Sequence, residues 1–223
     1  MPLPFAGGIE ATPNATLLFS LAAAIIYACA PPTPPRLSRT AAKAGSVALL
    51  ALLAFLQGGP WLLVAALALS AIGDAFLSRE GEAAFLGGLA SFLAAHLVYI
   101  ALFLKTGSGL EAFRAAPWHL ALALAMAGFA LLMLRLLWPR VGALRMPVAA
   151  YVAAILAMGL AALTTPALAL IGGAVLFMAS DAVLATEKFL MAQDSPHRAW
   201  MHRAVWLLYY PAQAVITLGL LLA

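Results

Sequence analysis

Charged side chains are scarce in this sequence. Only 9% of its 223 residues are Asp, Glu, Lys or Arg, whereas 65% are hydrophobic. Ordinary soluble domains carry about 25% charged residues. No hydrophilic stretch is long enough to form a soluble domain. The strands of a membrane barrel alternate apolar and polar residues, and this sequence shows no such alternation. The chain is therefore predicted to be an all-α integral membrane protein.

Cysteine is almost absent as well. Because Cys29 is the only thiol, the chain can form no intrachain disulfide and no cysteine-based metal site. The His, Asp and Glu residues show no metal-ligand spacing, and neither a Gly-rich phosphate loop nor a Ser-His-Asp order is present. We therefore expect no metal and no other cofactor. The net charge of +4 comes from basic residues that stand between apolar runs, a pattern of membrane topology rather than of nucleic-acid binding. Nothing in the sequence predicts a protein partner.

Eight apolar segments are long enough to cross a membrane, which takes about 20 residues. They lie roughly at residues 14–30, 41–57, 60–78, 83–104, 117–137, 146–163, 166–187 and 199–222. Helix-breaking residues separate them at Pro31–Pro35, Gly58–Pro60 and Thr164–Pro166. No Lys or Arg precedes Arg36, so we interpret the first segment as a membrane helix and not as a cleaved signal peptide.

The basic residues predict the orientation. Most of them flank the odd-numbered connections between the segments: Arg36, Arg39, Lys43, Arg79, Arg135, Arg140, Arg145, Lys188, Arg198 and Arg203. Only Lys105 and Arg114 belong to the opposite side. Because cytoplasmic loops carry the excess of Lys and Arg, we expect both termini outside and a multi-pass protein of the inner (plasma) membrane.

Two aspartates interrupt the apolar segments in matching surroundings. Asp74 lies in the stretch Ser70–Leu77 and Asp181 in Phe177–Leu184, and each is followed by Ala, an apolar residue and Leu. A carboxylate inside a membrane is energetically expensive, so such a residue is a functional-site hypothesis by default. Two of them in matching positions form a candidate paired-acid site. The alternative is a buried structural carboxylate that the chain has duplicated.

The two aspartates also match in depth and spacing. Each lies about 7–10 Å before a basic residue, Arg79 or Lys188, at a rise of about 1.5 Å per residue. They are 107 residues apart, close to half the chain. We therefore expect one membrane domain, 1–223, made of two tandem four-helix repeats with halves 1–113 and 114–223. The carboxyl groups are expected to meet in its interior, toward the cytoplasmic side.

Polar residues inside two other segments are the natural neighbours of the aspartates. His96 and Tyr99 are three residues apart and share a helix face, as do Tyr209 and Gln213, which are four apart. Gly87, Gly88 and Ser91, which precede His96, are small enough for close helix contact. Each polar residue has a simpler interpretation as a hydrogen bond between helices, and for Tyr210 alone we favour it.

Several charged groups stand at the expected water boundary. Glu80 and Glu187 each follow an aspartate by six residues and are expected to be solvated. Lys188 and the neighbouring arginines are interpreted as topology signals at the level of the head groups. Their functional alternative is a cradle for a lipid phosphate beside the aspartates, for which Lys188 is the best candidate.

Four motifs in order resemble one known family. Gly73-Asp74-Ala75-Phe76-Leu77, His96-x-x-Tyr99, Ser180-Asp181 with Lys188-Phe189, and Tyr209-Tyr210-x-Ala212-Gln213 together resemble the YhhN-type lysoplasmalogenases. The resemblance covers nearly the whole chain. It implies an eight-helix membrane enzyme that hydrolyses the vinyl-ether bond of a lysoplasmalogen, a lysophospholipid. The implied products are a fatty aldehyde and glycerophosphoethanolamine or glycerophosphocholine.

The chemistry of that reaction fits the residues. Hydrolysis of a vinyl ether needs a proton donor, an anion that stabilises the oxocarbenium ion, and water. A carboxylic acid beside a carboxylate supplies the first two, as in glycosidases. We expect Asp74 and Asp181 to take these roles, and the sequence leaves open which residue takes which. The residues that would orient substrate, water or the pair are His96, Tyr99, Ser180, Lys188, Tyr209, Tyr210 and Gln213.

Two other classes use paired membrane acids. A proton-coupled transporter of a small molecule or lipid is the main alternative. Against it, the two aspartate-bearing segments have no internal Gly/Pro break of the kind that marks discontinuous transport helices. An intramembrane aspartyl protease would need Gly where the chain has Ala71, and Tyr where it has Ser180.

Overall fold

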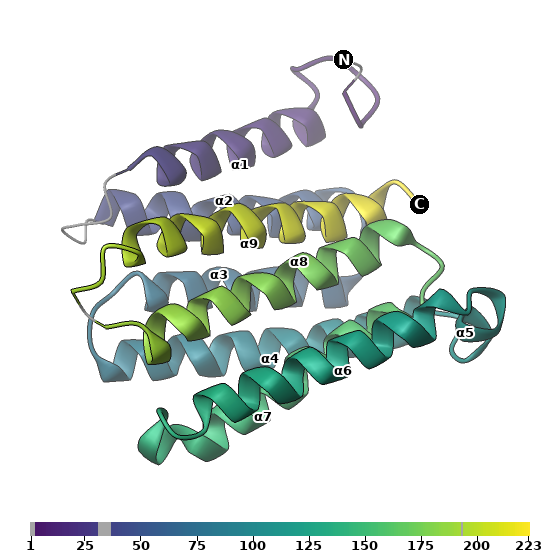
Figure 1. Cartoon of the computed structure of the whole chain (residues 1–223). Helices are drawn as coiled ribbons and strands as arrows, with labels where there is room; N and C mark the ends of the chain where they lie inside the picture. Colours follow the sequence, from purple (N-terminus) through teal and green to yellow (C-terminus); the bar gives the residue numbers. More distant parts are fainter. Residues whose placement is uncertain (1–2, 31–36, 193) are drawn as a thin grey trace. The chain divides into compact units, whose positions relative to one another are not determined.

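The computed structural model describes residues 3–30, 37–192 and 194–223, and every regular element in these ranges is helical (Figure 1). The elements are α1 (Thr12–Cys29), α2 (Leu37–Leu56), α3 (Trp61–Leu77), α4 (Glu82–Thr106), α5 (Glu111–Ala115), α6 (Trp118–Leu137), a 3-10 turn η1 (Gly142–Leu144), α7 (Arg145–Ala162), α8 (Leu168–Ala185), a π-helical turn η2 (Thr186–Leu190) and α9 (Arg198–Leu221). The prediction of an all-helical protein is confirmed for the described residues.

One helix corresponds to each of the eight predicted apolar segments, with ends that differ by a few residues. Seven helices in the described part of the chain are long and apolar enough to cross a membrane. The remaining one, α3, has 17 residues and is equally apolar but shorter. The short helix α5 and the turn η2 were not predicted.

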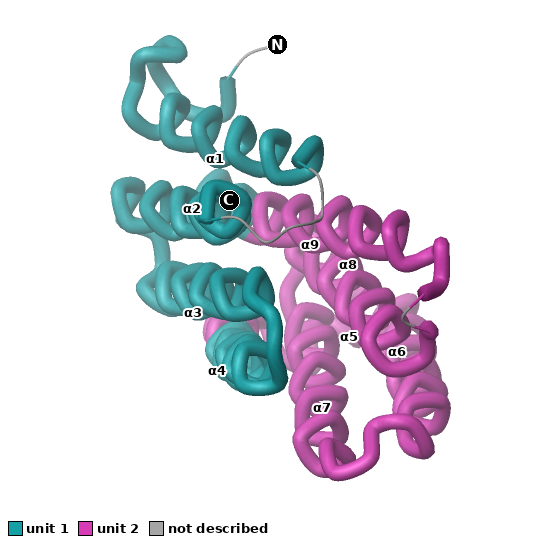
Figure 2. The backbone as a smooth tube through the Cα atoms, turned by 90° about the vertical axis from the view of Figure 1, so that its left-hand side faces the viewer, with its two compact units in different colours: residues 1–99, 217–223 teal, residues 100–216 magenta. Residues whose placement is uncertain are grey.

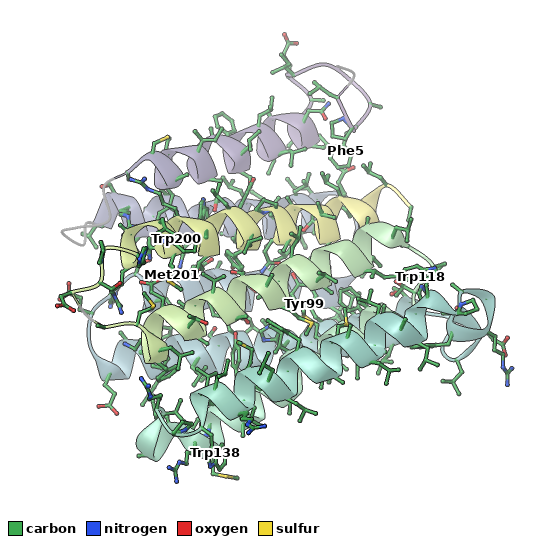
Figure 3. The ribbon with its side chains drawn as sticks, viewed as in Figure 1. Phe5, Tyr99, Trp118, Trp138, Trp200 and Met201 are labelled. Carbon is green, nitrogen blue, oxygen red and sulfur yellow. The ribbon has the colours of Figure 1, made fainter. Side chains whose placement is uncertain are left out.

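Helix α6 illustrates the membrane character. Trp118 and Trp138 lie at its two ends (Figure 3), where the amphipathic rings of Trp are enriched at membrane–water interfaces. Between them Leu120, Leu124 and Leu131 share one face of the helix and are about three-fifths exposed. Large apolar side chains exposed along a helix face indicate contact with lipid.

The chain divides into two compact units, coloured separately in Figure 2. Unit 1 comprises Met1–Tyr99 and Thr217–Ala223, and unit 2 comprises Ile100–Ile216. The boundaries fall inside α4 and α9. Unit 1 therefore holds α1, α2, α3 and the first part of α4. Unit 2 holds α6, α7, α8 and most of α9.

In unit 1, α2 and α3 form a tight antiparallel hairpin. The turn is Gly58–Pro60, as predicted, and Gly58 has φ +63°, a conformation that costs Gly no steric strain. Backbone hydrogen bonds from Gly58 to Phe55 (3.0 Å) and from Gly59 to Ala54 (2.8 Å) close it. The two helices pack against each other along their length, which sets their side chains in a fixed register.

In unit 2, α7 and α8 form the corresponding hairpin. Its turn, Thr164–Pro166, is again the predicted one. The amide of Ser108 donates to the carbonyl of Thr164 (2.8 Å), so the end of α4 is tied to this turn. Helix α6 packs against α7, and α7 packs against α8.

The placement of two basic residues corrects the sequence analysis. Arg39 and Lys43 were assigned to a connection, but α2 begins at Leu37 and contains both. Lys43 is only 8% exposed, so it is not a head-group residue. The predicted breaker Pro31–Pro35 and Arg36 lie outside the described residues.

Candidate active site

Asp74 lies in the last turn of α3 and is 1% exposed. Its Oδ1 forms an ion pair with Nζ of Lys43 on α2, at 3.0 Å. Packing of α2 on α3 brings the two residues together, although 31 positions separate them in the sequence. Removing one partner of such a buried pair costs about 3–5 kcal/mol, because the other charge is left buried.

The surroundings of Lys43 are aromatic and cationic. The Tyr27 ring of α1 lies 5.9 Å from Nζ of Lys43, and the guanidinium of Arg39 lies over the same ring at 4.6 Å. Arg39 also donates to the hydroxyl of Tyr27 at 3.3 Å. The electron-rich ring face attracts both cations. Arg39 is a second cation close to Lys43. The carboxylate of Asp74 offsets the repulsion between these two positive charges.

Close packing of α4 on α3 supports this part of unit 1. A Cβ added to Gly73 would stand 2.7 Å from the Phe92 ring, and one added to Gly88 would crowd Leu77. The hydroxyl of Ser91 donates to the carbonyl of Leu69 at 2.7 Å. The prediction that Gly87, Gly88 and Ser91 permit close helix contact is confirmed.

His96 and Tyr99 continue the same helix. Both side chains are fully buried at 0% exposure, and their spacing puts them on one face of α4 (Tyr99 is labelled in Figure 3). Full burial of two polar side chains is unusual, because buried polar groups need hydrogen-bond partners. Their orienting role in a reaction stays a prediction.

Asp181 lies in α8 and is half-buried. The hydroxyl of Tyr151 on α7 donates to its Oδ2 at 2.7 Å. Tyr151 comes 30 residues before Asp181, nearly the spacing of Lys43 from Asp74. In each unit, then, the helix before the aspartate helix supplies a polar partner. One partner is an ammonium and the other is a neutral phenol.

Helix α8 is in close contact with α9 next to Asp181. The hydroxyl of Ser180 donates to the carbonyl of Val205 on α9, at 3.0 Å. Ser180 is 1% exposed, and this bond gives it a packing role in addition to any role in orienting its neighbour. A Cβ added to Gly173 would lie 3.1 Å from the carbonyl oxygen of Ala212, so the two helices are in close contact there as well.

The predicted polar residues of α9 lie in an aromatic environment. Tyr209 meets the edge of Phe177 at 5.4 Å, and Tyr210 stacks on Trp206 at 5.6 Å. Both tyrosines are nearly buried, and Gln213 is 0% exposed. The stacking of Tyr210 agrees with the packing role favoured for it alone.

The π-helical turn η2 carries the charged residues after Asp181. Lys188 is exposed, in keeping with a head-group position. Glu187 was predicted to be solvated, and this prediction is wrong. Its side chain is 13% exposed and lies 3.7 Å from Arg198, whose Nη1 also donates to the backbone carbonyl of Glu187 at 2.7 Å. The ion pair and the hydrogen bond with Arg198, at the start of α9, hold Glu187 in this partly buried position.

Two residues next to the aspartates were not among the predicted site residues. Each of the two aspartates contacts a residue that sequence reasoning missed: Lys43 for Asp74 and Tyr151 for Asp181. The expected meeting of Asp74 with Asp181 stays a prediction. Among the described residues, no three His, Cys, Asp or Glu side chains are grouped so that they could hold a metal ion.

Comparisons with known proteins give a consistent result. A family model described as the YhhN family matches residues 38–220. The lysoplasmalogenase of Mycobacterium bovis is 34% identical over 164 residues, which cover 70% of this chain and 59% of that protein. The human lysoplasmalogenase TMEM86B is 38% identical over 167 residues, which cover 72% of this chain and 63% of that protein. The chain thus spans about three-fifths of the length of these curated relatives.

No solved structure matches the chain. The family match covers all four motifs that suggested the resemblance, and it includes both aspartates together with Lys43 and Tyr151. Relatives in a bacterium and in a human align over more than two-thirds of the chain. The chain belongs to the YhhN family.

Proposed function

We propose that this protein is a lysoplasmalogenase. In this proposal it hydrolyses the vinyl-ether bond of a lysoplasmalogen within the membrane and releases a fatty aldehyde and glycerophosphoethanolamine or glycerophosphocholine. The observation that carries the proposal is that two aspartates interrupt the apolar helices α3 and α8 and that each contacts a polar side chain from the preceding helix. The names of the relatives supply the reaction to which two such acids are suited.

The reaction places definite demands on the two acids. A carboxylic acid transfers its proton to the β-carbon of the vinyl ether, and an oxocarbenium ion forms at the carbon attached to oxygen. A carboxylate stabilises this cation and removes a proton from the water that attacks it. The resulting hemiacetal then breaks into an aldehyde and an alcohol. A positioned acid or base of this kind contributes about 10²–10⁴-fold to the rate.

The other predicted residues serve this chemistry from their helices. His96 and Tyr99 on α4 and Tyr209, Tyr210 and Gln213 on α9 orient the acids, the water or the substrate. Lys188, exposed on η2, contacts the phosphate of the head group. A lysolipid fits a site about two turns below the surface, because its head group stays in the interface while the vinyl ether lies just beneath.

Aldehyde release is the direct test of this function. The purified protein in detergent is expected to release one fatty aldehyde per lysoplasmalogen consumed. It is expected to leave the corresponding saturated-ether lysolipid intact, because that lipid has no double bond to protonate. Absence of aldehyde with ethanolamine and choline substrates alike would contradict the proposal.

The transporter alternative gives a different result in the same preparation. A proton-coupled carrier would move labelled lysolipid or another solute into proteoliposomes under a pH gradient and would leave the vinyl ether uncleaved. We expect hydrolysis to proceed at the same rate with and without the gradient. Gradient-driven uptake without aldehyde release would contradict the enzyme proposal and support the carrier.

The proposal also includes the membrane topology. Eight helices, α1 to α4 and α6 to α9, cross the inner membrane as two tandem four-helix repeats, with both termini outside and the acids near the cytoplasmic face. Single cysteines at Ser108 and Ala192, both exposed, report on opposite faces in a Cys29→Ser background. An impermeant maleimide is expected to label Ser108→Cys on intact cells and Ala192→Cys only after permeabilisation. The reverse labelling pattern would show that the protein has the opposite orientation in the membrane.

A further inference from the structure

A group of arginines lies at one end of α6. Arg135 is in the last turn of α6, Arg140 is in the turn that follows, and Arg145 begins α7. All three side chains are exposed, and the sequence has no Asp or Glu from residue 112 to residue 180. None of the three forms an ion pair with a residue that the structure describes. This end of α6 and α7 is therefore cationic.

Arg145 is held in place by Trp138. Its Nε donates to the backbone carbonyl of Trp138 at 3.2 Å, and its guanidinium carbon lies 5.6 Å from the centre of the Trp138 ring. A guanidinium presents five N–H donors in a planar fork, and the carbonyl takes only the one on Nε. The two terminal nitrogens remain for a phosphate, which an arginine can bind through two parallel hydrogen bonds.

The turn between α6 and α7 is anchored from the inside. Leu137, Val141 and Val148 are nearly buried and form a hydrophobic cluster, against which Leu144 packs. The amides of Arg140 and Val141 donate to the carbonyl of Leu137 at 2.8 and 3.1 Å. The arginines thus stand on an ordered turn, so binding of a ligand requires less ordering of the chain than it would in an unstructured loop.

An exposed face of α6 leads along the helix to these arginines. Five residues at intervals of three or four share this face: Leu124, Gly128, Leu131, Arg135 and Trp138, the last of which is labelled in Figure 3. A Cβ added to Gly128 would meet nothing within 4 Å, so the face is open between the two leucines. From Leu124 to Arg135 the helix rises about 16 Å, close to half of a hydrocarbon core about 30 Å thick. The apolar part of the face therefore spans one leaflet.

Charge and apolar surface together indicate what binds here. A soluble anion would use the arginines alone, whereas a phospholipid uses the arginines and the apolar face at once. The Trp138 ring marks the level of the head groups, where Trp is enriched in membrane proteins. In a zwitterionic lipid the phosphate charge is offset by the ammonium of the same head group. A cationic site without acidic residues therefore favours a lipid with a net negative charge.

We propose that this end of α6 and α7 binds one anionic phospholipid. The phosphate lies between Arg135 and Arg145, beside the Trp138 ring. One acyl chain follows the exposed face from Leu131 to Leu124. The proposal does not depend on the reaction that the protein catalyses, and it uses none of the residues assigned to the candidate active site.

Native mass spectrometry of the full-length protein in detergent tests this site, because it resolves each bound lipid. The probes are phosphatidylglycerol and phosphatidylcholine with identical acyl chains. The first phosphatidylglycerol is expected to bind about 25-fold more tightly than the first phosphatidylcholine, since each arginine near a membrane surface contributes about fivefold. Equal affinities would overturn the proposal. Inorganic phosphate is expected not to displace the lipid, and displacement by phosphate would assign the arginines to a soluble anion instead.

Variants distinguish a built site from charges that only set the topology. Arg145→Gln is expected to weaken phosphatidylglycerol binding about fivefold, and Arg135→Gln/Arg145→Gln to abolish the preference over phosphatidylcholine. Arg145→Lys keeps the charge and the orientation signal but loses the planar fork over Trp138. It is expected to weaken binding about threefold or more. Wild-type affinity in Arg145→Lys would overturn the site and leave the arginines as topology signals.

Lys105 provides the matched control. It is exposed near the end of α4 and has no printed role at the α6–α7 turn, so Lys105→Gln removes the same charge from unit 2 without touching the proposed site. This variant is expected to keep the wild-type preference for phosphatidylglycerol. A loss equal to that of Arg145→Gln would show that the lipid responds to net charge alone, which would also overturn the proposal.

Discussion

Replacement of either Asp74 or Asp181 by Asn is expected to lower kcat for lysoplasmalogen hydrolysis by about 10²–10⁴-fold. Asn has nearly the same shape as Asp but can neither donate a proton to carbon nor carry the negative charge that stabilises an oxocarbenium ion. KM is expected to change little, because the acids act on the transition state more than on the bound lipid. The measurement is single-turnover and steady-state aldehyde release by purified variants of confirmed thermal stability.

Matched controls exist for both substitutions. Glu80 follows α3 and is exposed, and Asp194 stands exposed between η2 and α9. Glu80→Gln and Asp194→Asn change the charge near the membrane surface in the same way as the test variants but touch neither acid. Both are expected to keep wild-type activity, so a loss in the test variants cannot be attributed to net charge.

The double variant distinguishes joint action from separate roles. If the two aspartates act on one substrate, Asp74→Asn/Asp181→Asn is expected to be about as inactive as the worse single variant, since residues that act as a unit are far from additive. Activity close to that of the wild type in both single variants would exclude the paired-acid mechanism. It would leave the family membership untouched.

The sequence predicted the helices well because their signal is strong. A membrane helix must be apolar over about 20 residues, and the breakers at Gly58–Pro60 and Thr164–Pro166 interrupt that pattern sharply. Both turns are found where they were predicted. The helix α5, Glu111–Ala115, was missed because five residues of mixed polarity carry no periodic signal.

The partners of the aspartates could not be predicted in the same way. Lys43 is the seventh residue of α2, and a lysine near a helix end usually extends toward the head groups. Whether it extends outward or pairs inward depends on how α2 is rotated against α3, which the sequence does not specify. Tyr151 was missed for the same reason, because the orientation of α7 toward α8 has no sequence signature. The spacings of 31 residues from Lys43 to Asp74 and 30 residues from Tyr151 to Asp181 can be counted in the sequence. They indicate a contact only when it is known which helices form the hairpins.

Substitution of Gly173 by Leu is expected to destabilise the protein by about 3 kcal/mol, the upper end of the usual range for overpacking. A Cβ at this position would stand 3.1 Å from the carbonyl oxygen of Ala212 and 2.5 Å from Ile216. The carbonyl belongs to the backbone of α9 and cannot rotate away, so α8 and α9 must separate. Close approach through small residues is a common source of helix association in membranes.

The neighbouring glycine is the control. Gly172 is exposed on α8, and an added Cβ there would meet nothing within 4 Å. Gly172→Leu is expected to raise stability slightly, because Leu favours a helix over Gly by about 0.8 kcal/mol and an apolar side chain suits lipid. Thermal unfolding in detergent compares the two variants, and equal midpoints would contradict the close contact of α8 with α9. Separation of these helices would also break the bond from Ser180 to Val205 and displace Asp181, so Gly173→Leu is expected to lose hydrolysis even below its unfolding temperature.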